Sequence, residues 1–154
     1  MARQIAFGST RRCTLPGTRQ EILVIVLIDT DVLIDVALER KLHVASASAL
    51  LDALEQRQAS AFVAWHSISN FHYLVQPTRG RAGARQFVLD LTSFIDVAPT
   101  TTTSLRFAAS VDMKDFEDAM QVAAAMACGA EVIATRNIKD YAKSPVKAAT
   151  PKEV

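Results

Sequence analysis

The stretch Ile22-Leu23-Val24-Ile25-Val26-Leu27-Ile28-Asp29 decides the fold of this chain. Seven consecutive apolar residues, mostly β-branched, are typical of a strand buried on both faces of a parallel sheet, because a half-exposed strand would alternate with polar residues. Asp29 follows this strand, and ligands of open α/β sheets bind at the carboxyl ends of the strands. Asp29 is therefore a candidate functional residue. The alternative is that it only caps the helix that follows.

Helical and strand-like segments alternate along the remainder of the chain. The spacing of apolar residues predicts helices over residues 32–40, 46–57, 65–75, 86–94, 104–111 and 115–128. Short apolar runs predict strands over residues 59–64, 95–98, 131–135 and 146–148. This alternation predicts right-handed crossovers, and therefore an α/β fold, a three-layer α/β/α sandwich with a central parallel sheet.

Local signals predict where several elements begin and end. Ser46 or Ser48 is expected to cap the second helix, and the threonines of residues 100–103 are expected to cap a later one. Pro77 is expected to end the third helix, because proline removes a backbone donor and restricts the residue before it. Residues 76–85 hold glycines together with three arginines, which predicts a loop with concentrated positive charge.

Length and composition indicate one globular domain. The chain has 154 residues, of which 50% are hydrophobic. Its net charge of +1 gives no sign of a general nucleic-acid binder, so any contact with a polyanion must come from a local patch. Residues 1–21 are interpreted as a mobile N-terminal extension and residues 22–154 as the domain. Cys13 and Cys128 are too few and too scattered for a disulfide framework, and no apolar run is long enough for a membrane span. We expect a cytoplasmic protein without a membrane partner.

Acidic residues recur where predicted elements end. Asp29 follows one strand, Asp140 follows another, and Asp118 begins the helix between them, so all three could reach one edge of a parallel sheet. Carboxylates held together repel each other, and a divalent cation bound through oxygen compensates them. The sequence therefore predicts a Mg²⁺ or Mn²⁺ site. Asp115 shares a helical face with Asp118 and could add a ligand, or it could only stabilise the start of its helix.

Three motifs in this order resemble the PIN domain family, metal-dependent ribonucleases that include the VapC-type toxins of bacterial toxin–antitoxin pairs. The motifs are Leu27-Ile28-Asp29-Thr30-Asp31-Val32-Leu33, Asp115-Phe116-Glu117-Asp118-Ala119 and Ala134-Thr135-Arg136-Asn137-Ile138-Lys139-Asp140-Tyr141. The resemblance covers residues 23–154, nearly all of the chain outside the extension. It implies a PIN-like sandwich with its functional residues at one edge of the sheet.

The resemblance also implies roles for individual residues. Asp29 matches the first acid of the family and Asp118 the third. The position of the second acid, normally Glu, falls on Asn70, and the fourth falls on Asn137 or, with its charge retained, on Asp140. The polar residues implied to support the site are Thr30, Asp31, Asn70, Thr135 and Asn137.

By this resemblance, Asp29, Asp118 and Asp140 would hold one or two Mg²⁺ or Mn²⁺ ions, and a metal-activated water would attack an RNA phosphate. The implied partners are RNA, an antitoxin protein and a second copy of the chain. Arg79, Arg81 and Arg85 could hold the RNA backbone, although an exposed basic loop can also be simply solvated.

Two other functions remain compatible with the residues. Asn70 and Asn137 are neutral where the family carries acids, which favours a PIN-like module that binds RNA or protein without catalysis. The sequence Asp29-Thr30-Asp31 also fits the first motif of haloacid dehalogenase-type phosphatases, with Asp29 as nucleophile. The short chain counts against the phosphatase.

Overall fold

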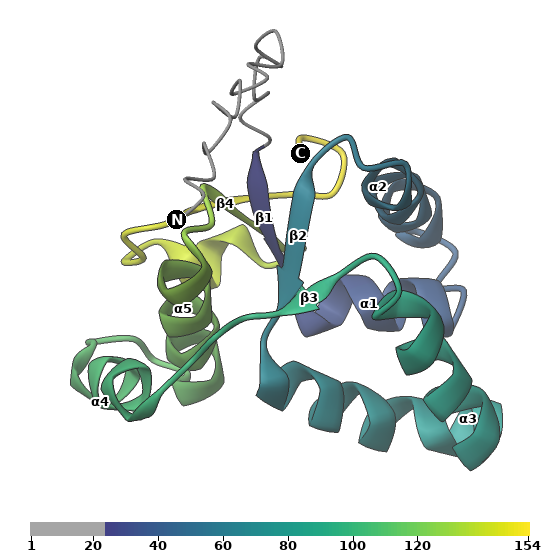
Figure 1. Ribbon diagram of the computed structural model, residues 1–154, viewed down its shortest axis with the longest axis horizontal. Helices are drawn as coiled ribbons and strands as arrows, with labels where there is room; N and C mark the ends of the chain where they lie inside the picture. Colours follow the sequence, from purple (N-terminus) through teal and green to yellow (C-terminus); the bar gives the residue numbers. More distant parts are fainter. Residues whose placement is uncertain (1–23) are drawn as a thin grey trace, which may run out of the picture.

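The computed structural model describes residues 24–154, so the extension predicted over residues 1–21 lies outside the described residues. Its five strands form one sheet in the order β3-β2-β1-β4-β5, and every neighbouring pair is parallel (Figure 1). The strands are β1 (Ile25–Ile28), β2 (Ser60–Val63), β3 (Asp96–Val97), β4 (Val132–Ala134) and β5 (Lys147–Ala149). The predicted parallel sheet is confirmed, and residues 25–28 of the decisive apolar stretch form its central strand.

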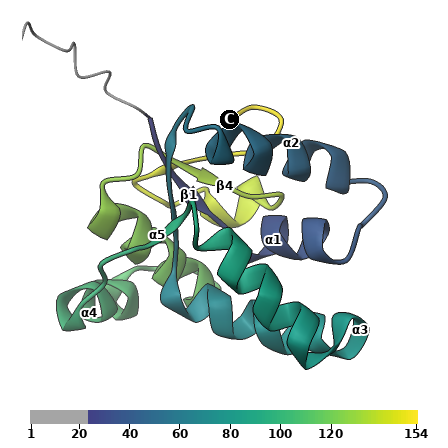
Figure 2. The ribbon, with the colours of Figure 1, turned by 45° about the vertical axis from the view of Figure 1, so that its right-hand side comes forward.

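Helices cover both faces of this sheet. They are α1 (Thr30–Ala37), α2 (Val44–Glu55), α3 (Trp65–Leu91), α4 (Thr102–Ser110), α5 (Phe116–Cys128) and the 3₁₀ helix η1 (Ile138–Tyr141). Helix α1 packs against α2 and α3 on one side, and α4 packs against α5 on the other (Figures 1 and 2). The predicted three-layer sandwich is therefore confirmed. None of the helices within residues 24–154 is both long and apolar enough to cross a bilayer.

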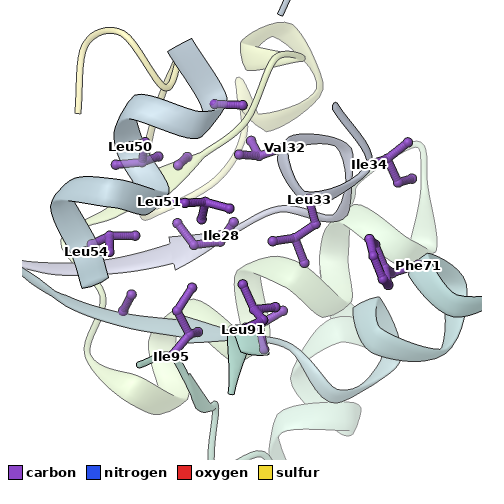
Figure 3. Packing of buried hydrophobic residues seen from close by; sticks show 14 of the residues in the cluster. Ile28, Val32, Leu33, Ile34, Leu50, Leu51, Leu54, Phe71, Leu91 and Ile95 are labelled. Atoms are coloured by element: carbon purple, nitrogen blue, oxygen red, sulfur yellow. The ribbon is translucent and has the colours of Figure 1, made fainter. Parts of the chain in front are cut away.

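Strand β1 supplies side chains to the cores on both faces. Val26 and Ile28 belong to the cluster formed with α1, α2 and α3, whereas Leu27 faces α5 and packs near Val122. All three β1 residues are fully buried, because alternate side chains of a central strand point to opposite covered faces. Figure 3 shows Ile28 among the larger cluster, close to Leu33. This packing fixes β1, and with it the position of Asp29.

The prediction that the third helix ends before Pro77, with a basic loop over residues 76–85, is wrong. Helix α3 continues to Leu91, with a break at Gly80, which has a φ of 72°. Proline is tolerated because the carbonyl that its missing N–H would have bonded belongs to Tyr73, an exposed residue whose carbonyl water can reach. Glycine adopts the positive φ at the break without steric cost. The three arginines are therefore on a bent helix.

The predicted N-cap is wrong for α2 and right for α4. Helix α2 begins at Val44 with His43 as its N-cap, so the prediction of a serine cap is wrong. Ser46 instead lies inside the first turn, where its hydroxyl donates to the carbonyl of His43 at 3.1 Å. Helix α4 begins within the threonine run as predicted. Thr101 is the N-cap there, and its backbone N–H donates to the hydroxyl of Ser104 at 3.2 Å.

Candidate active site

A pocket of about 400 Å³ opens at the carboxyl edge of the sheet. It is lined by Asp29, Thr30, Asp31, Ile34, Asn70, Tyr73, Leu74, Glu117, Asp118 and Asn137. These residues come from the starts of α1 and α5, from α3, and from the turn that follows β4. Six of the polar residues singled out from the sequence thus lie together in one cavity: Asp29, Thr30, Asp31, Asn70, Asp118 and Asn137.

Asp29 is the most enclosed acid of this pocket. It is the N-cap residue of α1, but its side chain makes no capping hydrogen bond, and only 8% of the residue is exposed. Its Oδ1 accepts a hydrogen bond from Gln121 Nε2 and its Oδ2 accepts one from the hydroxyl of Tyr141, both at 3.0 Å. Burial, reinforced by the nearby charge of Asp31, raises the pKa of Asp29 to about 6. Asp29 therefore does more than begin a helix.

Asp118 faces the same pocket from the first turn of α5. Burial raises the pKa of Asp118 to about 6, and the charge of Asp29 is the next largest cause, followed by those of Asp115 and Asp140. The charge of Asp29 thus acts on Asp118 across the cavity. A cation placed between them would relieve this repulsion.

Asp31 is engaged by an arginine that sequence reasoning did not single out. Its Oδ2 accepts a hydrogen bond from the backbone N–H of Arg136 at 2.9 Å, and the guanidinium Nε lies 3.5 Å away. The same Nε lies 3.0 Å from the fully buried carboxylate of Asp35. Burial raises the pKa of Asp31, while Arg136 opposes the rise. Arg136 therefore balances the charge of Asp31 and leaves Asp29 and Asp118 as the less compensated pair.

Glu117 brings a further carboxylate to the pocket, beside the amide of Asn70. Asn70 Nδ2 donates to Glu117 Oε1 at 2.7 Å, which joins α3 to α5. The side chain of Asp115 is used differently, because it caps α5 by accepting from the N–H of Glu117 at 2.8 Å. Glu117 thus lines the pocket, and Asp115, which is exposed, does not.

Other residues predicted for the site lie around the pocket. Thr135 is fully buried and donates to Asp31 Oδ2 at 3.3 Å. Asp140 is exposed on η1 and outside the pocket lining, although its charge acts on Asp118. Within residues 24–154, no group of three His, Cys, Asp or Glu side chains converges closely enough to form a metal-ligand set. The three acids predicted to bind the metal therefore do not all lie in one place. Asp29 and Asp118 share the pocket, and Asp140 lies outside its lining.

The three arginines predicted to hold RNA do not line the pocket. Arg79 donates to the carbonyl of Ala37, and its guanidinium lies 3.4 Å from the carboxylate of Glu39. Arg81 and Arg85 are exposed on the second arm of α3. Arg79 thus ties α3 to the end of α1.

A sequence model of the PIN domain matches residues 25–139. The chain belongs to the PIN domain family. The matched region contains Asp29, Asn70, Asp118 and Asn137, and it ends one residue before Asp140. The match confirms the family resemblance and gives no support to the haloacid dehalogenase alternative. No curated protein matches this PIN-domain chain in sequence.

Solved structures of toxin–antitoxin proteins share the fold. A chain of VapBC2 from Rickettsia felis, bound to a promoter DNA fragment, has a TM-score of 0.63 at 12% identity, covering 82% of this chain and 98% of that one. FitAcB from Neisseria gonorrhoeae has a TM-score of 0.58 at 16% identity, and the match covers 84% of this chain and 99% of that one. VapC20 from Mycobacterium tuberculosis is a toxin that cleaves the sarcin-ricin loop. It has a TM-score of 0.57 at 14% identity, and the match covers 70% of this chain and 86% of that one. At these identities the likeness shows the fold alone.

Several polar residues around Asp29 were missed by the sequence reasoning. Gln121 and Tyr141 hydrogen-bond directly to Asp29, and Arg136 pairs with Asp31. Gln121 follows Asp118 by three residues on one helical face, and it is a single amide among the apolar residues of α5. That isolated polar residue in a core-facing stripe was the available signal.

Proposed function

We propose that this PIN-domain protein is a Mg²⁺- or Mn²⁺-dependent endoribonuclease that acts in the cytoplasm as the toxin of a toxin–antitoxin pair. The observation that carries the proposal is the facing pair of Asp29 and Asp118 in one pocket at the carboxyl edge of the sheet. Burial raises the pKa of each to about 6, reinforced at Asp29 by the charge of Asp31 and at Asp118 by the charge of Asp29. Membership of the PIN family supplies the class of reaction.

The pocket residues fit a hard divalent cation. Among the ion pairs of residues 24–154, none involves Asp29 or Asp118, so a bound cation would supply the missing positive charge. Mg²⁺ is commonly held by only one or two carboxylates, with water and phosphate oxygens completing its shell. The amide oxygens of Asn70 and Asn137 could add neutral ligands. Asp140 and Asp115 stay proposed as outer carboxylates, since the charges of both act on Asp118.

A divalent ion bound there would lower the pKa of a bound water and offset the charge of the scissile phosphate. The chain itself would orient this chemistry. Asp29 is held rigidly inside the pocket by its two hydrogen bonds, whereas Asp118 is partly exposed at its rim. The exposed ring of Tyr73 also lines the pocket and offers a surface on which an unpaired RNA base could stack.

The test is RNA cleavage by purified protein with Mg²⁺ or Mn²⁺, with chelator, and with Asp29→Asn and Asp118→Asn variants. Asp52→Asn is the matched control, because Asp52 is an exposed acid on α2. We expect metal-dependent cleavage by wild type and the control, with a large loss in both pocket variants. Cleavage that survives either chelator or the pocket variants would reject the proposal.

A toxin role leads to expectations that can be tested separately from RNA cleavage. Induced expression of wild type should arrest growth, and co-expression of a small antitoxin encoded beside it should restore growth. The structural likeness to VapBC2 and FitAcB supports such a partner, and a homodimer is proposed on family grounds. Absence of growth arrest by a protein that cleaves RNA in vitro would remove the toxin role and leave the nuclease.

A module that binds without catalysis is the second candidate, favoured by the neutral Asn70 and Asn137 in the pocket. It predicts RNA binding that neither chelator nor Asp29→Asn affects, with no cleavage under any metal condition. Measurement of binding and cleavage on the same RNA separates the two functions.

A further inference from the structure

Gln121 is a polar residue in an otherwise apolar part of α5. It is fully buried, together with Val122 and Ala124 beside it. A buried amide is costly unless its polar groups are hydrogen-bonded, so its position calls for an explanation beyond packing. Its Nε2 has acceptors, whereas its Oε1 has no partner within the described residues. The amide is thus only half satisfied, and the satisfied half faces the pocket acids.

The Nε2 atom of Gln121 lies at the meeting point of three elements. It lies 2.7 Å from the hydroxyl of Ser67 on α3, 3.0 Å from Asp29 Oδ1 and 3.3 Å from the hydroxyl of Thr30 on α1. An amide nitrogen has two protons, so the two shortest contacts, to Ser67 and Asp29, account for both. Of these two acceptors, only Asp29 carries a charge.

Asp29 is held from its other side by Tyr141. The ring of Tyr141 is almost completely buried, and its hydroxyl donates to Asp29 Oδ2. A carboxylate otherwise turns easily about its last side-chain torsion. A donor on each oxygen removes this freedom and fixes the plane of the group. Both donors are neutral, so they orient the carboxylate without cancelling the charge that a cation needs.

We propose that Gln121 and Tyr141 are positioning residues that clamp the Asp29 carboxylate, one on each oxygen, in the orientation that binds a divalent cation. The inference rests on the proposed function, since it assigns a role to residues behind the proposed metal ligand. Donors that orient a metal ligand without touching the metal commonly change metal affinity by about 10- to 100-fold when removed. The clamp accounts for a polar residue inside α5 that packing does not explain.

A purely structural role is the competing explanation, in which Gln121 ties α5 to α3 through Ser67. The two roles depend on different contacts of Gln121 Nε2. The tether needs the 2.7 Å contact to Ser67, whereas the clamp needs the 3.0 Å contact to Asp29. Ser67→Ala removes the tether and keeps the clamp, which makes it a matched control within the same buried network.

The first experiment is Mn²⁺ titration of the full chain by calorimetry. We expect Gln121→Leu and Tyr141→Phe to weaken binding by about 10-fold or more, and Ser67→Ala by less than about 3-fold. Gln121→Met tests shape against chemistry, because it nearly keeps the size and shape of the side chain and has no donor. It should weaken binding as much as Gln121→Leu. Equal affinities in Gln121→Leu, Gln121→Met and Ser67→Ala would overturn the clamp.

The second experiment needs no metal. The side-chain NH₂ signals of Gln121 can be assigned in ¹⁵N-labelled protein by their loss in Gln121→Leu. We expect the proton bonded to Asp29 to shift strongly in Asp29→Asn, because its acceptor loses its charge. Ser67→Ala should shift mainly the other proton of the pair. An NH₂ pair unchanged by Asp29→Asn would overturn the clamp even if metal binds. If wild type binds no Mn²⁺ and the NH₂ pair shifts as expected, the metal site fails while the contact to Asp29 stands.

Discussion

The substitution Asp29→Asn is expected to stabilise the metal-free protein at neutral pH. The side chain keeps its size and can still accept a hydrogen bond, while the buried charge disappears. Asp29 has a pKa of about 6 in the folded protein, against 3.8 for an unperturbed carboxyl. Each unit of such a shift corresponds to roughly 1.4 kcal/mol, so ionising Asp29 at pH 7 costs the folded state up to about 3 kcal/mol.

The sign of the pH dependence follows from this raised pKa. The folded state binds the proton more tightly than the unfolded state, so the contribution of Asp29 to stability is fully present below pH 3.8. It is lost as the pH rises through 6. The amide of Asp29→Asn cannot ionise and avoids the loss. The difference in unfolding free energy between variant and wild type should therefore be small near pH 4 and largest near pH 7.

Urea denaturation in the presence of chelator, at pH 4, 5, 6 and 7, measures this difference. At pH 7 we expect Asp29→Asn to exceed wild type by about 1–3 kcal/mol, or several degrees in Tm for a chain of this size. Asp52→Asn, on the exposed face of α2, serves as the control and should show no such difference. Saturating Mg²⁺ should narrow or reverse the gap, since it stabilises only wild type. A variant that is less stable than wild type at pH 7, or whose advantage does not change with pH, would refute the reasoning.

Three further predictions follow from the site and its supports. Arg136→Met should lower the unfolding free energy by up to about 3–5 kcal/mol, because it removes the closer of the two cations beside the buried Asp35 and leaves only Arg40, whose Nη1 lies 3.6 Å from Asp35 Oδ1. A loss below about 1 kcal/mol contradicts the pairing. Glu117→Gln should leave the unfolding free energy almost unchanged, since the new amide oxygen still accepts from Asn70. It should weaken Mn²⁺ binding several-fold. Unchanged affinity in calorimetry would place Glu117 outside the metal site. Gly129→Ala should lower the unfolding free energy, measured by thermal melt, by about 1–2 kcal/mol, because Gly129 has a φ of 70° at the end of α5. A neutral effect would argue against that conformation.

The sequence predicted the sheet well because its signal is local. A run such as that ending at Ile28 can be satisfied only by burial on both faces, so it had to become a central parallel strand. Helix α3 was predicted less well. Pro77 and Gly80 are both local signals for the end of a helix, but only Gly80 marks a break. At Pro77 the helix continues, beside the exposed Tyr73.

The candidate site was predicted in part. Asp29 and Asp118 were found because topology alone brings the carboxyl end of β1 and the start of α5 to one edge. The donors Gln121 and Tyr141 were missed because their role depends on which side chain lies opposite, and only the three-dimensional packing fixes that. The same limit applies to Asp140, whose exposed position depends on the short turn of η1.

Asp29 and Asp118 line one cavity, and we propose that they share a divalent cation. Calorimetric titration of Mn²⁺ into chelator-treated wild type and into the Asp29→Asn, Asp118→Asn double variant tests it most directly. We expect saturable binding by wild type and its loss in the folded double variant. Equal binding by the two proteins, or no binding by wild type, would contradict it.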